Sequence, residues 1–396
     1  MKLFMLLKQC AKIAVIKTKI LVKKMKFTIE RANLLKSLSH VQSIVEKRNT
    51  IPVLSNVRIE AMEDGISFKA TDMDTEITEI VDAKTIETGA TTAPAHMLYD
   101  IVRKLSDGSD VELTFPDDKG QLTIASGKSK FSLSCIGVED FPVISGDKLP
   151  TNFVMAKEEL KDVIDRTKFA VSTEETRYYL NGVYMHAKNE GEAKVLRVVA
   201  TDGHRLACVE SPLPKGAENM VGVIIPRKTV GEIRKLLDDT GAGEITIAMS
   251  ENKIRFTMED ITLTSKLIDG TYPDYERVIP TDNDKVLELG VKDLASAVDR
   301  VSVVAERTRA IKMLTAKNHV TITTSSPDLG SAQEEVEAKY DSEALEIGYN
   351  FRYLLDILAE VKGDSVRISF ADGSSPSVIH DTSDSSAIYV LMPMRV

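Results

Sequence analysis

The chain has 396 residues, a length that predicts two or three domains, and 43% of them are hydrophobic, which is enough to build cores. Its net charge of −9 is opposite to that of a typical nucleic acid-binding domain, and the absence of tryptophan argues against a stacking platform for single strands. No apolar run is long enough to span a bilayer, so we expect no membrane partner. Three distant cysteines (Cys10, Cys135 and Cys208) predict reduced thiols and a cytoplasmic location, and the six histidines show no metal-ligand spacing.

The first 24 residues carry seven lysines and no acidic residue. Lysines interrupt each apolar run and no small-residue cleavage site follows, so the segment does not match a secretory signal. Two interpretations remain. The segment is either a basic amphipathic arm that contacts membrane or nucleic acid, or the product of an upstream start codon, with Met25 as the true first residue. The start-codon interpretation is the simpler one and is favoured.

A pattern of two helices and several strands then recurs three times, with a period of roughly 130 residues. In the first copy, hydrophobic residues spaced i, i+3, i+4 and i+7 predict a helix over 31–45, and alternating runs rich in β-branched residues predict strands. The further elements expected in this copy are strands over 55–62 and 65–72, a helix over 94–106, and strands over 111–115, 121–125 and 131–136.

The second and third copies follow the same order of elements. The second predicts a helix over 157–171, strands over 181–188 and 195–202, a helix over 226–239, and strands over 244–249, 253–258 and 261–268. The third predicts a helix over 292–304, strands over 309–316 and 319–326, a helix over 350–362, and strands over 366–370, 377–380 and 387–394. Turn-rich linkers near 145–152 and 279–285 separate the copies. We therefore expect an α+β protein of three repeated domains, each with two helices and antiparallel sheets.

The stretch VVATDGHRLA, residues 198–207, has the composition of a catalytic loop. A carboxylate near an imidazole can orient a general base, so one interpretation is a hydrolase that uses Asp202 and His204. However, residues 195–200 and 205–209 both read as strand, and Asp202 and Gly203 lie at their junction, where Asp-Gly is typical of a tight hairpin whose turn residues both have positive φ. The other copies have turn-prone residues at the same place, Asp72-Met73 and Ser326-Pro327-Asp328. A structural turn is favoured, and since no phosphate-binding loop or nucleophile elbow occurs either, we expect a protein that is not an enzyme.

Positive charge is concentrated in the six predicted helices. Lys and Arg outnumber Asp and Glu by seven over the windows 31–47, 96–106, 157–168, 227–237, 292–309 and 350–362, whereas the rest of the chain after residue 24 carries a net −23. Solvated helix faces often carry Lys and Arg, but acidic residues are equally common there. The surplus therefore favours helices that share one surface facing a polyanion, with salt-sensitive contacts to phosphates and no base reading.

The chain ends in YVLMPMRV, which is hydrophobic and methionine-rich up to the final residue. Chain ends are usually polar and frayed. One interpretation is a last edge strand that completes the sheet of the third copy. The other is a surface for varied partners, which adaptable methionine side chains suit. Both interpretations remain open on the sequence.

From Met25 to Val396 the chain resembles the bacterial sliding clamps, the β subunits of DNA polymerase III. The resemblance is carried, in the family's order, by MKFTIERANLLKSL (25–38), RYYLNG (177–182), ATDGHRLA (200–207), SKLIDGTYPDYERVIP (265–280) and YVLMPMRV (389–396). It implies clamp domains at 25–149, 150–281 and 282–396 after the basic extension 1–24. The threefold repeat agrees with this division independently.

The resemblance implies a head-to-tail homodimer closed into a ring of six similar domains, with helices lining the bore and sheets forming the outer wall. Such a ring encircles double-stranded DNA without reading its sequence, as a non-catalytic processivity factor of the polymerase holoenzyme, and needs no cofactor. The replicative polymerase, the clamp loader and repair proteins are expected to insert short apolar peptides into a pocket. The alternatives are the hydrolase and a peptide-binding adaptor that forms no ring.

The family's partner pocket lies between the second and third domains and carries over residue by residue. It implies an apolar groove with polar anchors that include His204, Arg205 and Arg277. The last residue is Val396, where the family often has leucine. The implied pocket residues are Leu180, Thr201, Gly203, His204, Arg205, Leu206, Pro273, Arg277, Val278, Val390, Met392, Pro393, Met394, Arg395 and Val396.

Two further surfaces are expected. On the DNA-facing side, Arg48 matches a family DNA contact and Tyr179 lies beside another. The charges of the helix windows add Arg103, Lys104, Arg227 and Lys228 to that side. The contact between protomers is expected to involve Phe131 of the first domain with Val303 and Val304 of the third.

Overall fold

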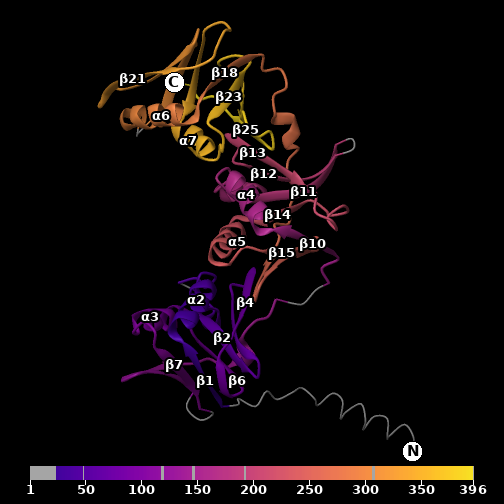
Figure 1. Cartoon of the computed structure of the whole chain (residues 1–396), viewed down its shortest axis with the longest axis vertical. Helices are drawn as coiled ribbons and strands as arrows, with labels where there is room; N and C mark the ends of the chain where they lie inside the picture. Colours follow the sequence, from indigo (N-terminus) through magenta and orange to yellow (C-terminus); the bar gives the residue numbers. More distant parts are fainter. Residues whose placement is uncertain are drawn as a thin grey trace, which may run out of the picture. The chain divides into compact units, whose positions relative to one another are not determined.

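A computed structural model describes residues 24–47, 49–116, 120–144, 148–190, 193–305 and 308–395 (Figure 1). Residues 1–23 of the expected basic extension, Arg48 and Val396 lie outside the described residues. The described chain forms two compact units. The first unit comprises the described residues of Met1–Gly146 and Thr257–Thr264, and the second comprises those of Asp147–Phe256 and Ser265–Val396.

The first unit contains the first copy of the repeated pattern. Its helices α2 (Arg31–Gln42) and α3 (Ala95–Lys104) pack against each other, and α2 also lies on β3 and β4. One antiparallel sheet has the strand order β5-β1-β7-β8-β9, and β4-β3-β2-β6 run antiparallel in another. The strands are β1 (Met25–Glu30), β2 (Asn56–Met62), β3 (Gly65–Thr71), β4 (Thr75–Val81), β5 (Lys84–Glu87), β6 (Gly89–Pro94), β7 (Asp110–Phe115), β8 (Gln121–Ser126) and β9 (Ser129–Ser134), with 3-10 turns η1 (Pro52–Ser55) and η2 (Val138–Asp140).

Helix α2 shows how hydrophobic spacing positions these elements. Leu34, Leu38 and Val41 recur on one face of the helix and are fully buried against the sheet. The helix ends at Gln42, three residues before the expected end at Val45. The N–H groups of Ile44 and Val45 donate to carbonyls three residues back, so the chain tightens into a 3-10 turn that still delivers Val45 to the core.

The second unit contains the third copy and the second copy apart from Thr257–Thr264. Its helices pair as α4 with α5 and α6 with α7. The strands of these two copies have the orders β10-β15-β16-β17, β14-β11-β12-β13-β25-β24-β23-β18 and β21-β20-β19-β22. The helices are α4 (Lys157–Lys168), α5 (Arg227–Asp239), α6 (Val291–Ala305) and α7 (Phe351–Ala359), with 3-10 turns η3 (Glu175–Leu180) and η4 (Tyr275–Val278).

The strands expected in the second and third copies are present with ends that differ by a few residues, whereas β10, β14, β18, β21 and β22 were not predicted. Those of the second copy are β10 (Thr151–Ala156), β11 (Gly182–Glu190), β12 (Ala193–Thr201), β13 (Arg205–Pro212), β14 (Val223–Pro226), β15 (Glu244–Met249), β16 (Lys253–Met258) and β17 (Ile261–Lys266). Those of the third are β18 (Lys285–Gly290), β19 (Ala310–Ala316), β20 (His319–Ser326), β21 (Gly330–Glu337), β22 (Leu345–Asn350), β23 (Ser365–Phe370), β24 (Ser377–Asp381) and β25 (Ala387–Leu391).

The second and third copies join edge to edge. Strand β25 pairs antiparallel with β24 on one side and with β13 on the other, so it lies inside an eight-stranded sheet and is not an edge strand. Leu206 lies opposite Val390 in this register, and both side chains are buried in one core. The hydrophobic end of the chain is therefore part of the sheet and its core as far as Leu391. Only the residues after Leu391 could form a surface for partners.

Candidate functional site

The turn between β12 and β13 is built by side chains that bind its own backbone. One carboxylate oxygen of Asp202 accepts the N–H groups of His204 at 2.9 Å and Arg205 at 3.0 Å, and the Thr201 hydroxyl accepts the N–H of Gly203 at 3.1 Å. Three residues connect the strands, and among them only Gly203 has a positive φ, of 86°. The expected two-residue turn with two positive φ angles is therefore wrong. The Asp202 carboxylate accepts two N–H groups of the turn in place of a backbone carbonyl, so Asp202 itself does not need a positive φ.

The first copy has the same turn. Asp72 accepts the N–H groups of Asp74 and Thr75, and the Thr71 hydroxyl accepts the N–H of Met73. Met73 takes the left-handed position with φ of 78°. The Thr-Asp pair is thus a recurring structural device, which supports the structural interpretation of Asp202.

The hydrolase interpretation finds no support in the placement of Asp202 and His204. Asp202 binds the backbone N–H of His204, and its second oxygen accepts Arg205 Nε at 3.1 Å. The His204 ring instead stacks on Tyr353 of α7, with centroids 6.1 Å apart and planes at 22°. Within the described ranges, no group of three or more His, Cys, Asp or Glu side chains could hold a metal ion.

Arg205 joins the second copy to the third. Its side chain, only 10% exposed, forms an ion pair with Asp356 of α7 and donates to the Phe169 carbonyl at 2.6 Å. The guanidinium also lies over the Tyr353 ring, 4.3 Å from its centroid, and over the Phe169 ring at 5.1 Å. Arg205 was expected to be a polar anchor for a partner. In the structure its donors are directed at the protein's own groups, so it holds α7 against β13.

The expected pocket residues divide into a buried floor and an exposed rim. Leu180, Leu206 and Val390 are buried in one cluster with Tyr272 and Tyr275. The rim is apolar and solvent-exposed, with Val278 54% exposed, Met392 42% and Met394 38%. Pro273, Gly203, Arg395 and Arg277 are exposed, Pro393 and Thr201 are half-buried, and Arg277 forms an ion pair with Asp274 at 2.7 Å.

Two backbone hydrogen bonds hold the end of the chain in place beyond β25. The Met392 N–H donates to the His204 carbonyl at 2.9 Å, and the Met394 N–H donates to the Gly348 carbonyl of β22 at 2.8 Å. Pro393, Met394 and Arg395 line a depression of about 310 Å³ beside these bonds. The structure thus brings the end of the chain to the turn at His204, as the resemblance implied.

Several residues of this region were not predicted from the sequence. Tyr353 and Asp356 share one face of α7, three residues apart, and this spacing could have indicated them. Tyr275 lies in the motif over 265–280 that carries the family resemblance, but no role was predicted for it. His186 and Arg197, which contact Tyr275, had no signal in the sequence because their contacts depend on the fold.

Among the residues expected to face DNA, those of the second unit lie together. Arg227 and Lys228 begin α5 and line a depression of about 570 Å³ with Tyr178. Tyr178 is exposed, whereas the expected Tyr179 is half-buried and meets it edge to face, with centroids 5.7 Å apart. Tyr178 is therefore the more accessible ring.

In the first unit, the two adjacent basic residues of α3 line different depressions. Arg103 forms an ion pair with Asp100 at 2.9 Å and lies over the Tyr99 ring, in a depression shared with the end of α2. Lys104 lines a second groove together with Phe131, which was expected to contact the other protomer. Lys104 thus shares a surface with the expected interface residue.

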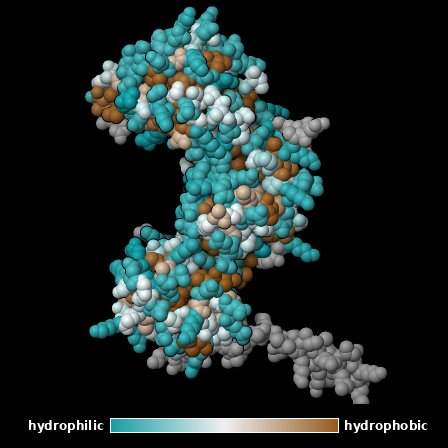
Figure 2. All heavy atoms as spheres, viewed as in Figure 1, coloured by the Kyte–Doolittle hydropathy of each residue, from teal (hydrophilic) through white to brown (hydrophobic). Residues whose placement is uncertain are grey.

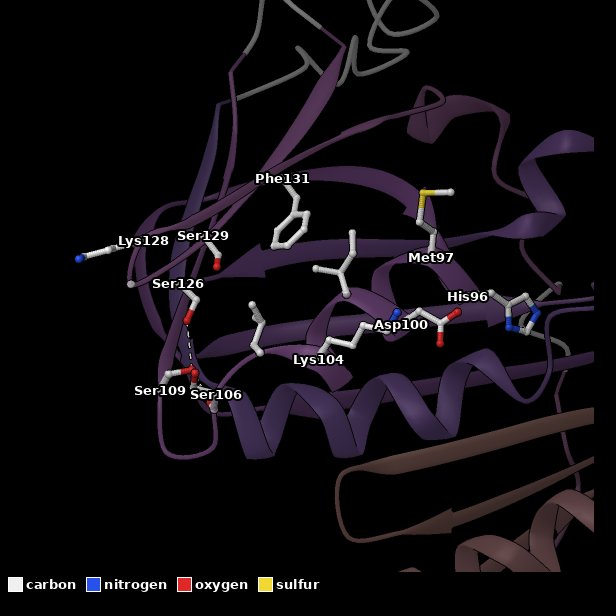
Figure 3. A pocket seen from close by; sticks show the side chains of 13 residues that line it. His96, Met97, Asp100, Lys104, Ser106, Ser109, Ser126, Lys128, Ser129 and Phe131 are labelled. Atoms are coloured by element: carbon white, nitrogen blue, oxygen red, sulfur yellow. Dashed lines mark hydrogen bonds between the residues drawn. The ribbon is translucent and has the colours of Figure 1, made fainter.

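This second groove, of about 830 Å³, lies between α3 and the β8–β9 hairpin (Figure 3). Phe131 extends from β9 toward the side chains of α3, where Met97 is 56% exposed. Strand β9 is the last strand of its sheet, and its side chains are almost all exposed. The groove combines an apolar wall with an open strand edge.

The remaining expected interface residues lie in the third copy. Val303 on α6 is 73% exposed, and Val304 is half-buried. Strand β21, which contacts α6, ends the four-stranded sheet. On the face drawn in Figure 2, both units are largely hydrophilic and the hydrophobic side chains are confined to small patches. In the part of the chain that is described, no helix is long and apolar enough to cross a membrane.

Models of three domains of one family match consecutive parts of the chain. The DNA polymerase III beta subunit N-terminal domain matches residues 25–145, the central domain 154–274 and the C-terminal domain 276–395. The chain is 50% identical over 373 residues to the beta sliding clamp of Caulobacter vibrioides and 36% identical over 374 residues to that of Escherichia coli K12. Each alignment covers 94% of this chain and all of the relative.

Solved structures agree with these matches. A DnaN sliding clamp from Bartonella birtlesii bound to griselimycin is 46% identical, with a TM-score of 0.91, and covers 94% of this chain and all of its own. A C. crescentus beta sliding clamp is 50% identical, with a TM-score of 0.92, and covers 95% of this chain and all of its own. The chain therefore belongs to the DNA polymerase III beta subunit family, the bacterial sliding clamps.

Proposed function

We propose that this chain is a processivity factor of DNA replication. Two copies would close head to tail around double-stranded DNA in the cytoplasm and tether the replicative polymerase, with no catalysis of their own. The observation that carries the proposal is the match of all three family domains, in order, over nearly the whole chain.

Ring closure is supported by the ends of the sheets. Strands β13 and β25 join two copies of the pattern by edge-to-edge pairing within one chain. Strands β9 and β21 are the last strands of a five-stranded and a four-stranded sheet, and exposed strand edges are usually covered. The β9 strand of one protomer would pair with β21 of another. A heterologous contact of this kind gives a ring when its rotation closes.

Side chains on these two edges are complementary. The β8–β9 hairpin carries Lys128 and Lys130, whereas β21 carries Glu334, Glu335 and Glu337. Beside these charges, Phe131 and the apolar wall of its groove would receive Val303 and Val304. Opposite charges next to an apolar centre favour one docking direction.

Duplex DNA would pass the helical face of the ring. The helix windows carry a net +7 in a chain that is otherwise strongly acidic. Tyr178, Arg227 and Lys228 form an accessible cluster on the second unit that would contact the DNA phosphates. By resemblance, Arg48 would also contact DNA. Contacts of this type hold phosphates without base specificity, so the ring could slide.

Partner proteins would dock through short apolar peptides in the groove between the second and third copies. The rim residues Val278, Met392 and Met394 offer exposed apolar surface over a rigid floor, and Arg277 offers a charged group. Peptides in such grooves obtain most of their affinity from a few buried apolar anchors. The replicative polymerase, the clamp loader and repair proteins are the expected partners.

The interface can be tested with a charge placed on β9. Phe131→Asp should convert the dimer to a monomer in size-exclusion chromatography with light scattering, because a carboxylate would be buried without a partner. Ile86→Asp is the matched control, since Ile86 is exposed on β5, the strand at the opposite end of the same sheet. A monomeric wild type, or a dimer that tolerates Phe131→Asp, would favour the adaptor that forms no ring.

A further inference from the structure

A column of aromatic rings lies behind the 3-10 turn that forms one wall of the groove. Tyr272 stacks on Tyr184, with centroids 4.7 Å apart and planes at 7°, and Tyr184 stacks on His186 at 4.8 Å. The His186 ring then meets Tyr275, the first residue of η4, at 5.8 Å. These rings connect strand β11 to a turn almost ninety residues later in the chain.

Turn η4 has an inner and an outer side. Tyr275 is buried, and Glu276 forms ion pairs with Lys188 of β11 and with Arg197 of β12. The next two residues, Arg277 and Val278, are exposed and belong to the proposed groove. With only four residues, the turn has little internal hydrogen bonding, so its position depends on what holds the inner side.

The hydrogen bonds of the inner side fix the direction of each proton. His186 Nδ1 lies 3.2 Å from the Ala187 carbonyl, which can only accept, so Nδ1 carries the proton. In a neutral ring Nε2 is then an acceptor, and Tyr275 Oη, 2.9 Å away, donates to it. The same hydroxyl oxygen accepts from Arg197 Nη1 at 3.4 Å, and Arg197 Nε donates to Glu210 at 2.5 Å.

The surroundings favour these protonation states at neutral pH. Burial is the largest influence on His186 and lowers its pKa, and the nearby Arg197 charge lowers it further, against the Ala187 hydrogen bond. Burial likewise raises the pKa of Tyr275. The titratable or charged groups around His186 are Tyr184 and Lys188 on β11, Arg197 on β12, Cys208 and Glu210 on β13, and Tyr272, Tyr275 and Glu276 on or before η4.

We propose that His186, Tyr275 and Arg197 are positioning residues that hold η4 and thereby set the wall of the partner groove formed by Arg277 and Val278. None of the three has to contact a partner. This inference rests on the proposed function of the groove and adds to it a dependence on pH. When acid protonates His186, Nε2 becomes a donor, the Tyr275 proton loses its acceptor, and a second positive charge faces Arg197.

The proposal is tested with His186→Phe, which keeps a ring but removes the acceptor, Tyr275→Phe, which removes the donor, and His186→Gln, whose amide oxygen can still accept. Tyr340→Phe is the matched control, because Tyr340 is also buried and its hydroxyl donates to the Glu343 carbonyl in the third copy. Two measurements are made on the full chain. The first is hydrogen exchange of the amides over 276–279. The second is the Kd for griselimycin, the ligand bound to the Bartonella birtlesii relative, by calorimetry at pH 7.5 and pH 5.

In the free protein, His186→Phe and Tyr275→Phe should exchange faster over 276–279, whereas His186→Gln and Tyr340→Phe should match the wild type. At pH 7.5 the first two should bind griselimycin about 2- to 10-fold more weakly, the equivalent of one hydrogen bond. The wild type should lose affinity at pH 5, whereas His186→Gln should lose less. His204 is present in both proteins, so the difference between them isolates His186.

Unchanged exchange over 276–279 in His186→Phe and Tyr275→Phe would overturn the positioning role. The same pH profile in the wild type and His186→Gln would overturn the pH dependence. Failure of the proposed groove itself looks different. In that case Arg277→Ala and deletion of Met392–Val396 would leave the Kd for griselimycin unchanged, while the exchange result would still decide whether the network holds η4.

Discussion

Removal of the Arg205 guanidinium tests how the second and third copies are held together. The substitution Arg205→Met keeps much of the side-chain volume but deletes the ion pair with Asp356, the bond to the Phe169 carbonyl and the contact with the Tyr353 ring. It also leaves Asp202 without its side-chain donor. The expected result is a weaker junction between β13 and α7.

The magnitude follows from burial. Breaking a buried ion pair by removing one partner costs about 3–5 kcal/mol. Arg205 is 10% exposed but Asp356 is 47% exposed, so solvent screening reduces the pair's share, whereas the lost cation–π contact adds about 1 kcal/mol. We expect a loss of about 3 kcal/mol. For a unit of this size it corresponds to a melting temperature lower by about 6 °C or more.

Differential scanning calorimetry of the full chain measures this change. The matched control is Arg352→Met, because Arg352 is also on α7 but is exposed. The control should change stability by less than about 0.5 kcal/mol. If Arg205→Met melts within about 1 °C of the wild type, the contacts of Arg205 do not stabilise the junction between β13 and α7, and the role given to this side chain is wrong.

Four other predictions concern a turn glycine, a hydrogen-bonded carboxylate, the end of the chain and one ring of the proposed groove. Gly203→Ala should destabilise by about 1–2 kcal/mol in chemical unfolding, because φ is 86° and the new Cβ would approach Arg177, whereas Gly231→Ala, inside α5 with open space around it, should be neutral or stabilising. Burial would raise the pKa of Asp381, but hydrogen bonds from Ser383, Gly363 and Lys362 outweigh burial and lower this pKa. The ionised carboxylate should therefore stabilise the fold above about pH 4, and this stabilisation should be lost as the pH falls through the lowered pKa of Asp381. Asp381→Asn should be less stable at pH 7 and show a smaller acid-induced loss in melting temperature; equal acid sensitivity would contradict this. Deletion of Met392–Val396 should abolish partner-peptide binding in fluorescence anisotropy but leave the dimer intact, and His204→Ala should weaken binding by about 1–2 kcal/mol.

Hydrophobic spacing predicted the helices and many of the strands because it depends on local geometry alone, but strands such as β10 and β18, which pair with strands distant in the chain, were not predicted. The period of α2 placed Leu34, Leu38 and Val41 on the buried face, and the same rule found all three copies of the pattern. The end of α2 was predicted three residues too late because Ile44 and Val45 remain buried in a 3-10 turn. A sequence shows the hydrophobic spacing of buried residues, but it does not show whether they lie in an α-helix or in a 3-10 turn.

The candidate site was predicted only in part. The family resemblance implied that the motif around His204 and the chain's last residues form one groove, and the structure brings Met392 to the His204 carbonyl. The role of Arg205 was not predictable, since its partner Asp356 lies 151 residues away and is defined only by the fold. The turn at Asp202 was assigned the wrong backbone angles because an Asp side chain that accepts backbone N–H groups and a two-residue hairpin share the same Asp-Gly dipeptide.

The central claim is that the protein holds DNA by encircling it, and linearisation of a loaded circle tests it most directly. The dimer is loaded on nicked circular DNA with a clamp loader, unbound protein is removed by gel filtration, and a restriction enzyme then opens the circle. A topological ring should remain with the circle and leave the linear product from its free ends, and capping those ends with bulky protein blocks should retain it. Equal retention on circular and open linear DNA would show binding by direct contact and would contradict the account.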